Sequence, residues 1–185
     1  MRPAFRRVLA ALALLGLAAA CSPQQEEAAR PAPFALTDEA MGRYCGMNVL
    51  EHEGPKGQVI LKGALEPIWF SSARDVVAFT LLPEEPKTYA ALYVSDMAVA
   101  PSWAEPGAKN WIEARDAWFV IGSTRRGGMG VAETVPFSTE KAAQDFAAAH
   151  GGAVVRFDKI PAAYVLGDAG PPDAAPHTPH DQHRH

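Results

Sequence analysis

The chain has 185 residues, of which 48% are hydrophobic and 21% charged. This is the composition of an ordinary globular protein, and the length allows one medium-sized domain or two small ones. The formal net charge is −4 at pH 7, and the sequence contains no basic patch, which argues against nucleic acid as a partner.

Residues 1–20 have the pattern of a secretory signal peptide. MRPAFRR carries three arginines and precedes the apolar run VLAALALLGLAAA, which is too short to span a bilayer with margin. The break LAAAC resembles a bacterial lipobox, and this resemblance predicts that Cys21 becomes the acylated, palmitate-bearing first residue of the mature chain. Ser22, rather than an aspartate, favours the outer membrane. The alternative is ordinary signal-peptidase cleavage, with Cys21 an incidental thiol.

The ends of the mature chain differ in composition from its middle. Residues 21–39 are polar and rich in alanine and proline, which predicts a flexible tether, and residues 167–185 have the composition of a disordered tail. Removal of the signal leaves 14 basic and 21 acidic residues, a net charge of −7. The folded part is therefore expected at residues 40–166.

Two similar halves are predicted within this folded part, at residues 40–100 and 101–166. The first half contains strand patterns at 57–63, 67–72 and 89–96 and a helix pattern at 72–82. The second contains strand patterns at 116–123, 133–138 and 153–158 and a helix pattern at 138–152. Each helix pattern opens with a serine or threonine N-cap, and the second ends in glycine.

The halves also share one spacing, which is F-S-[S/T], six residues, then F. It occurs at residues 70–79 and again at 137–146, with a proline- and tryptophan-rich connection at 100–114 between them. We therefore expect an α+β fold built from a duplicated ββαβ unit. A chance similarity between two ordinary α+β units is the alternative.

The stretch YCGMNVLEHEGPKGQ carries the candidate chemistry. If Cys21 bears lipid, Cys45 has no partner for a disulfide, although exported proteins normally pair their thiols. Gly46 and the Gly54–Pro55 pair disfavour a regular helix, and in an extended segment Cys45 and Met47 would face the same side. A few residues of loop could then bring His52 to the two sulfurs.

Thiolate, thioether and imidazole together form a soft ligand set that favours Cu(I) over zinc or calcium. The alternative reading makes Cys45 a small buried hydrophobe, Met47 a core filler and His52 a surface residue.

A wider set of motifs resembles one family. CGM, then a histidine, then GPKGQ, followed in order by PIWFSSARDVVAF, NWIEARDAWFVIGS and GGMG, resembles the nitrous oxide reductase accessory protein family, NosL, over roughly residues 40–160. GGMG departs from the family pattern by lacking a proline before the methionine. The resemblance implies a periplasmic, lipid-anchored copper-binding protein with a duplicated ββαβ fold.

The resemblance also implies a ligand set and a recipient. It assigns copper to Cys45, Met47, His52 and Met129. The implied partners are nitrous oxide reductase and its transporter-linked assembly complex of the NosDFY type. A carrier of this kind needs no catalytic residue.

Several other residues are weaker candidates. Met41 and Met97 are more typical of a core than of a ligand set, and His150 suits the carboxyl end of a helix. The tail offers four interleaved histidines that would collect copper loosely or else remain a solvated segment, namely His177, His180, His183 and His185.

Two other classes of function compete with a copper carrier. The fold implied by the resemblance is similar to that of organomercurial lyase, so Cys45 could serve a thiol-dependent enzyme, with Asp96 as its one acidic candidate. A structural envelope lipoprotein would instead bury Cys45 as an inert thiol.

Overall fold

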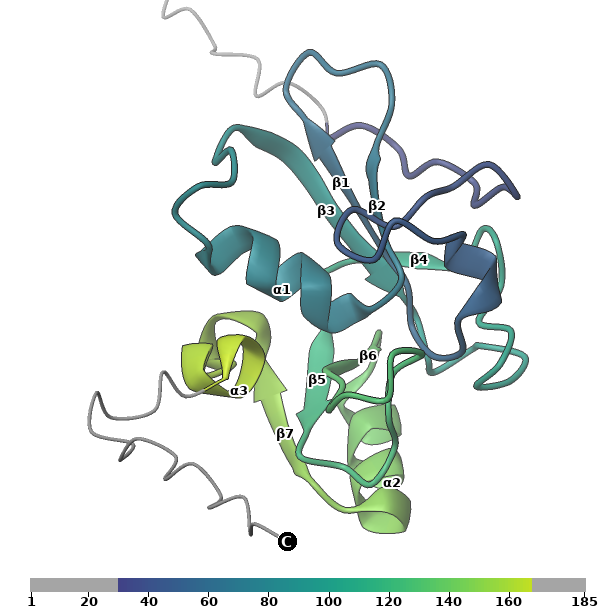
Figure 1. Cartoon of the computed structure of the whole chain (residues 1–185). Coiled ribbons are helices and arrows are strands. Elements are labelled where there is room, and N and C mark those ends of the chain that lie inside the picture. Colours follow the sequence, from purple (N-terminus) through teal and green to yellow (C-terminus); the bar gives the residue numbers. More distant parts are fainter. Residues whose placement is uncertain (1–29, 168–185) are drawn as a thin grey trace, which may run out of the picture.

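The computed structural model describes residues 30–167 (Figure 1). Cys21 and the four tail histidines lie outside the described residues. In the part of the chain that is described, no helix has both the length and the apolar character needed to cross a bilayer.

The first half forms an antiparallel sheet with one helix on its face. A short 3-10 helix, η1 (Val49–Glu51), precedes β1 (Gly57–Leu61), β2 (Ile68–Phe70), α1 (Ala73–Leu81) and β3 (Tyr89–Ser95). A further strand, β4 (Trp111–Glu113), gives the sheet order β2-β1-β3-β4. β1 pairs with both β2 and β3, so the first strand in chain order is the central strand of the ββαβ unit.

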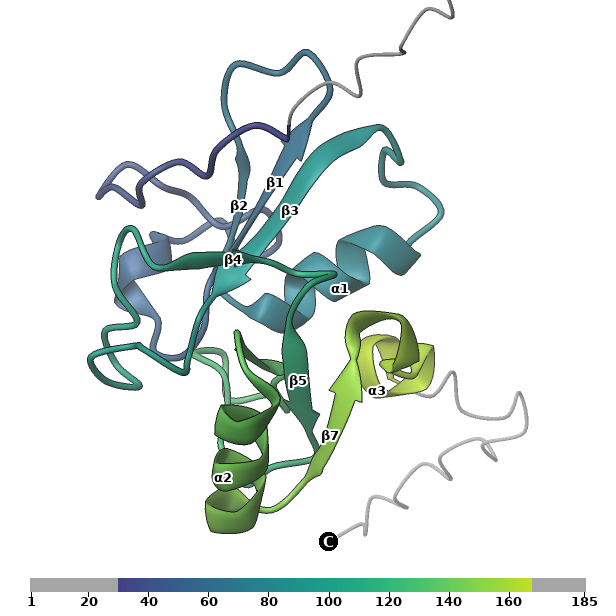
Figure 2. The same ribbon diagram turned by 180° about the vertical axis from the view of Figure 1, so that it is seen from behind.

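The second half repeats this arrangement (Figure 2). Its elements are β5 (Trp118–Ile121), β6 (Val135–Phe137), α2 (Glu140–His150) and β7 (Ala153–Arg156), followed by η2 (Phe157–Lys159) and α3 (Ala162–Leu166). The sheet order β6-β5-β7 again places the first strand in the centre, with antiparallel neighbours. The α+β fold with a duplicated ββαβ unit is confirmed.

The helix boundaries follow from their caps. The Ser72 hydroxyl accepts a hydrogen bond from the Arg74 N–H at the start of α1, and the Thr139 hydroxyl accepts one from the Ala142 N–H at the start of α2. α2 ends at His150 and is capped by Gly151, whose φ of 73° lies in the left-handed region that a residue with a side chain rarely adopts. These caps agree with the predicted ones.

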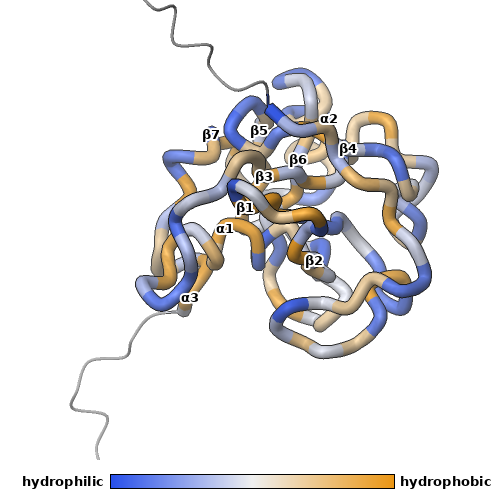
Figure 3. The backbone as a smooth tube through the Cα atoms, turned by 90° about the horizontal axis from the view of Figure 1, so that it is seen from above, coloured by the Kyte–Doolittle hydropathy of each residue, from blue (hydrophilic) through white to orange (hydrophobic). Residues whose placement is uncertain are grey.

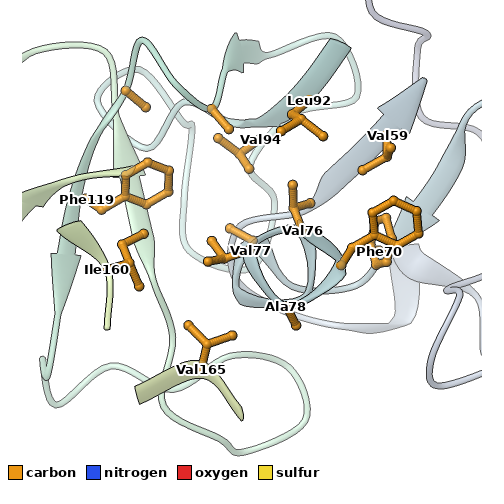
Figure 4. Packing of buried hydrophobic residues seen from close by; sticks show 14 residues of the cluster. Val59, Phe70, Val76, Val77, Ala78, Leu92, Val94, Phe119, Ile160 and Val165 are labelled. Carbon is orange, nitrogen blue, oxygen red and sulfur yellow. The ribbon is translucent and has the colours of Figure 1, made fainter. Parts of the chain in front are cut away.

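One hydrophobic core joins the two halves. α1 supplies its centre, and Figure 3 shows α1 among the hydrophobic segments. In Figure 4 the side chains of α1 lie between those of the first sheet and those of the second half, the labelled examples being Val76 and Val77 between Leu92, Val94, Phe119 and Ile160. α1 is therefore packed on both sides, by the first sheet and by the second half.

Two segments differ from the sequence-based expectations. The connection at 100–114 contains β4, which pairs with β3 through Tyr93 and Glu113. Residues 30–39 were expected to be a flexible tether, yet Phe34 makes two hydrogen bonds of 2.9 Å with the Gln58 side chain and Pro31 accepts one from Tyr93. The amide of a buried glutamine satisfies both backbone groups of Phe34, which the composition of the segment does not reveal.

Candidate metal centre

Cys45 lies in a closed loop between residues 41 and 48. An isolated bridge joins Met41 and Asn48, and the Gly42 N–H donates to the Met47 carbonyl at 2.9 Å. Gly46 has a φ of +66°, so the chain turns sharply after Cys45. The expectation that Cys45 and Met47 share one face of an extended segment is therefore wrong. The Cys45 Sγ instead lies 3.9 Å from the Met47 carbonyl oxygen.

The Cys45 loop is fastened to the end of β2. The Arg43 N–H donates to the Trp69 carbonyl at 2.8 Å, and the Ser71 hydroxyl lies 3.4 Å from the Cys45 Sγ. A Cβ at Gly42 would lie 2.5 Å from that sulfur, so the space of the thiol depends on a glycine there. The thiol is half-buried and free of any disulfide.

His52 reaches the thiol through a single 3-10 turn. The Asn48 side chain accepts from the Leu50 N–H at 2.8 Å and so caps η1, and the His52 N–H closes the turn on the Val49 carbonyl. The His52 Nε2 lies 3.9 Å from the Cys45 Sγ. His52 is 8% exposed and Met47 is 38% exposed, the reverse of a core methionine and a surface histidine. The alternative that Met47 is a core filler and His52 a surface residue is therefore wrong.

Met129 comes to the same region from the second half of the chain. Its loop, between β5 and β6, is closed by the Gly127 N–H bonding to the Val131 carbonyl at 3.0 Å. A Cβ at Gly128 would lie 2.4 Å from the His52 Cβ, so this loop lies directly against His52. Met129 follows Gly128 and is 48% exposed.

Glu133 ties the Met129 loop to the start of α1. Its carboxylate accepts from the Ser72 hydroxyl at 2.9 Å and from the Arg74 N–H at 2.8 Å. A Cβ at Gly127 would lie 2.6 Å from the Glu133 Oε2, so the loop packs on this carboxylate. Burial raises the Glu133 pKa to about 7, against the opposing effect of the hydrogen bonds from Arg74 and Ser72. Sequence reasoning missed Glu133, because a glutamate before a short strand has no local signal of burial.

The donors near Cys45 suit a soft ion. Bond lengths of about 2.3 Å to thiolate and about 2.0 Å to imidazole, the values for zinc, add to slightly more than the observed 3.9 Å, so one ion could bridge the two atoms without moving the backbone. Within residues 30–167, no three histidine, cysteine or acidic side chains form a potential metal site. Thioethers, such as those of Met47 and Met129, are soft donors that suit Cu(I).

The weaker candidates have other surroundings. The His150 ring packs on Phe146 with a centroid separation of 4.5 Å, and Met97 packs against the second-half core. Met41 is exposed at the edge of the Cys45 loop. The Asp96 carboxylate accepts from the N–H groups of Ala98 and Ser138 at 2.9 Å each, so it closes a turn after β3. These contacts offer no support for Asp96 as a proton donor to Cys45.

Comparison with known proteins decides the family. The NosL family model matches residues 33–165. The chain belongs to the NosL family. It is 44% identical over 167 residues to the copper-binding lipoprotein NosL of Achromobacter cycloclastes, covering 90% of this chain and 85% of that protein. It is 33% identical over 181 residues to the copper-binding lipoprotein NosL of Stutzerimonas stutzeri, covering 95% of this chain and 93% of that protein.

A solved NosL structure supports the same assignment. The crystal structure of the copper chaperone NosL from Shewanella denitrificans matches with a TM-score of 0.66 at 38% identity, covering 72% of this chain and 98% of that one. These NosL proteins are named as copper-binding lipoproteins or as a copper chaperone, and the names lend no support to the enzyme or the inert structural lipoprotein.

Proposed function

We propose that the chain is a copper carrier that binds one Cu(I) ion between the Cys45 loop and the Met129 loop. The observation that carries this proposal is the Cys45 Sγ at 3.9 Å from the His52 Nε2, beside the loop of a second-half methionine. Cys45, His52, Met47 and Met129 are the proposed ligands. The copper-binding names of the NosL relatives support it.

The mixed burial of the donors suits transfer rather than storage. His52 is buried, whereas Cys45 is half-buried and both methionines are exposed. A buried imidazole fixes one side of the ion, while exposed thioethers leave an edge where a ligand of a recipient can enter before the ion leaves. Thioether is neutral and a soft donor for Cu(I).

An anaerobic Cu(I) titration against a chromophoric chelator tests the site. We expect one tight ion per chain and loss of most of the affinity in Cys45→Ser, because Cys45 is the only cysteine among residues 30–167 and so their only anionic sulfur donor. Met47→Leu and Met129→Leu should each weaken binding, with Met97→Leu, a methionine packed in the core, as the matched control. Full affinity in Cys45→Ser would show that the tight site lies elsewhere.

The proposed recipient is nitrous oxide reductase, through its transporter-linked assembly complex of the NosDFY type. Copper-loaded protein should restore copper to the assembly-competent apo-reductase, and the Cys45→Ser variant should not. The proposed position is the periplasmic face of the outer membrane, with lipid on Cys21. Cys21→Ala should release the protein from the outer-membrane fraction, and retention there would exclude this anchor.

A further inference from the structure

Lys56 is a buried, positively charged residue that is not among the proposed copper ligands. Its side chain is 1% exposed, and its ammonium group donates a hydrogen bond to the His52 carbonyl oxygen. Among residues 30–167, no carboxylate forms an ion pair with it. Burying an ammonium group without an ion-pair partner costs free energy, so its position directly behind His52 calls for an explanation.

Both backbone groups of Lys56 form hydrogen bonds with Ser95 at the end of β3. Its N–H donates to the Ser95 hydroxyl at 3.0 Å, and its carbonyl accepts from the Ser95 N–H at 3.0 Å. A Cβ at Gly57 would lie 2.1 Å from the Val76 Cγ2, so the next residue packs closely against α1. The base of the lysine side chain therefore cannot shift without disturbing the first-half core.

The residues before Lys56 are fastened as well. The Pro55 carbonyl accepts from the Ala73 N–H at 3.1 Å, at the start of α1. The Gly54 N–H donates to the Trp103 carbonyl at 2.8 Å, and Gly54 has a φ of +82°. The GPKG turn is thus a rigid frame attached to a strand, a helix and a loop.

His52 has two fixed contacts, because its N–H donates to the Val49 carbonyl and Gly128 packs against its Cβ. It ends the three-residue helix η1, and a cleft of about 400 Å³ lies beside it. The cleft is lined by His52, Lys56, Leu36, Leu50 and residues 104–108. The imidazole consequently has room to turn away from Cys45 if its backbone is released.

We propose that Lys56 is a positioning residue for the copper site, which holds the His52 carbonyl and thereby keeps the imidazole facing the Cys45 thiol. This inference rests on the proposed copper function. It assigns a role to the lysine of the GPKG turn, which contacts a ligand residue without itself being a ligand. Groups of this kind outside the ligand set orient ligands, and their loss typically weakens metal binding.

The test is a double-mutant cycle on the purified protein with Cu(I) and a competing chelator. Lys56→Met keeps the bulk of the stem and removes the donor, and it should weaken Cu(I) binding about 10- to 100-fold. His52→Ala should weaken binding too, and Lys56→Met added to His52→Ala should have little further effect, because the ligand that Lys56 orients is already gone. The melting temperature of Lys56→Met should change little, because the relief of a buried charge offsets the loss of the hydrogen bond to the His52 carbonyl.

Two further variants complete the design. Lys56→Arg keeps the charge and the donor, and the cleft beside Lys56 gives room for the larger group, so we expect binding close to wild type. Lys87→Met is the matched control, because the Lys87 ammonium also donates to backbone carbonyls, those of Phe79 and Thr80 near the end of α1, at 3.3 and 3.1 Å. It should leave Cu(I) affinity unchanged.

The outcomes separate this inference from the proposed function. Absence of tight Cu(I) binding in the wild-type protein would overturn the copper function itself. Tight wild-type binding with equal affinity in Lys56→Met, or an equal penalty for Lys56→Met with and without His52, would overturn the positioning role alone. Should Lys56→Met fail to fold, Lys56→Gln goes through the same cycle, and the same two results decide.

Discussion

Glu133→Gln should flatten the pH dependence of the free energy of unfolding. Glu133 is 1% exposed, and burial raises its pKa from the ordinary 4.5 to about 7. Because the pKa is higher in the folded state, the folded protein holds this proton more tightly than the unfolded chain. The stabilising effect is complete below about pH 4.5 and is lost as the pH rises through about 7.

The size of the effect follows from the two pKa values. A rise from 4.5 to about 7, at about 1.4 kcal/mol for each pKa unit, corresponds to about 3 kcal/mol. Glutamine can still accept from the Arg74 N–H and can donate to the Ser72 hydroxyl, but it does not titrate. Burial also raises the Asp75 pKa to about 6, so Asp75 too lowers the free energy of unfolding as the pH rises. Asp75 is still present in the variant. The difference between wild type and Glu133→Gln therefore reports Glu133 together with its electrostatic coupling to Asp75 and Lys56.

Urea unfolding from about pH 4 to about pH 8 measures this difference, provided that the slope against urea stays constant. The two proteins should be closest in stability at low pH, and the glutamine variant should gain on the wild type by up to about 3 kcal/mol near neutrality. Glu140→Gln, at an exposed position in the first turn of α2, controls for the loss of one negative charge. The reasoning would be refuted if the free energies of unfolding of wild type and Glu133→Gln changed with pH in parallel. It would also be refuted if the wild type became more stable relative to the variant as the pH rises.

Three further predictions concern the loops and the tail. Gly128→Ala places a methyl group 2.4 Å from the His52 Cβ, so it should cost about 1–3 kcal/mol in urea unfolding and weaken Cu(I) binding. Gly130→Ala is the control, because its methyl group meets no atom within 4 Å. It should lower only the stability, through its left-handed φ. Met129→Leu conserves volume, so its melting temperature should stay within a few degrees of wild type while chelator competition shows weaker Cu(I) binding. Deletion of residues 171–185 should lower total copper uptake in equilibrium dialysis but leave the tightest site intact, and loss of that site would contradict the division between the two.

The sequence was sufficient for the strands and helices of the two ββαβ units and for a hypothesis about the chemistry, but it did not predict β4 or α3. Strand and helix patterns, helix caps and the repeated F-S-[S/T] spacing depend on residues close together in the chain, and these predictions agree with the structure. The residue types Cys45, Met47 and His52 indicate a soft metal because ligand preference is a property of the side chains. Met129 became a candidate ligand only through the family resemblance.

Only the tertiary structure decided how these groups meet. Gly128 lies against His52, and Glu133 reaches the start of α1, across separations of more than 50 residues. The burial of Lys56 and the packing of Phe34 on Gln58 likewise depend on β3 and β1 rather than on neighbours in the chain. A local pattern reports the periodicity of one element, whereas burial and approach distance depend on which elements pack together. The sequence therefore determined the proposed donors of this protein, and the packing of its two halves around α1 decided which loops surround them.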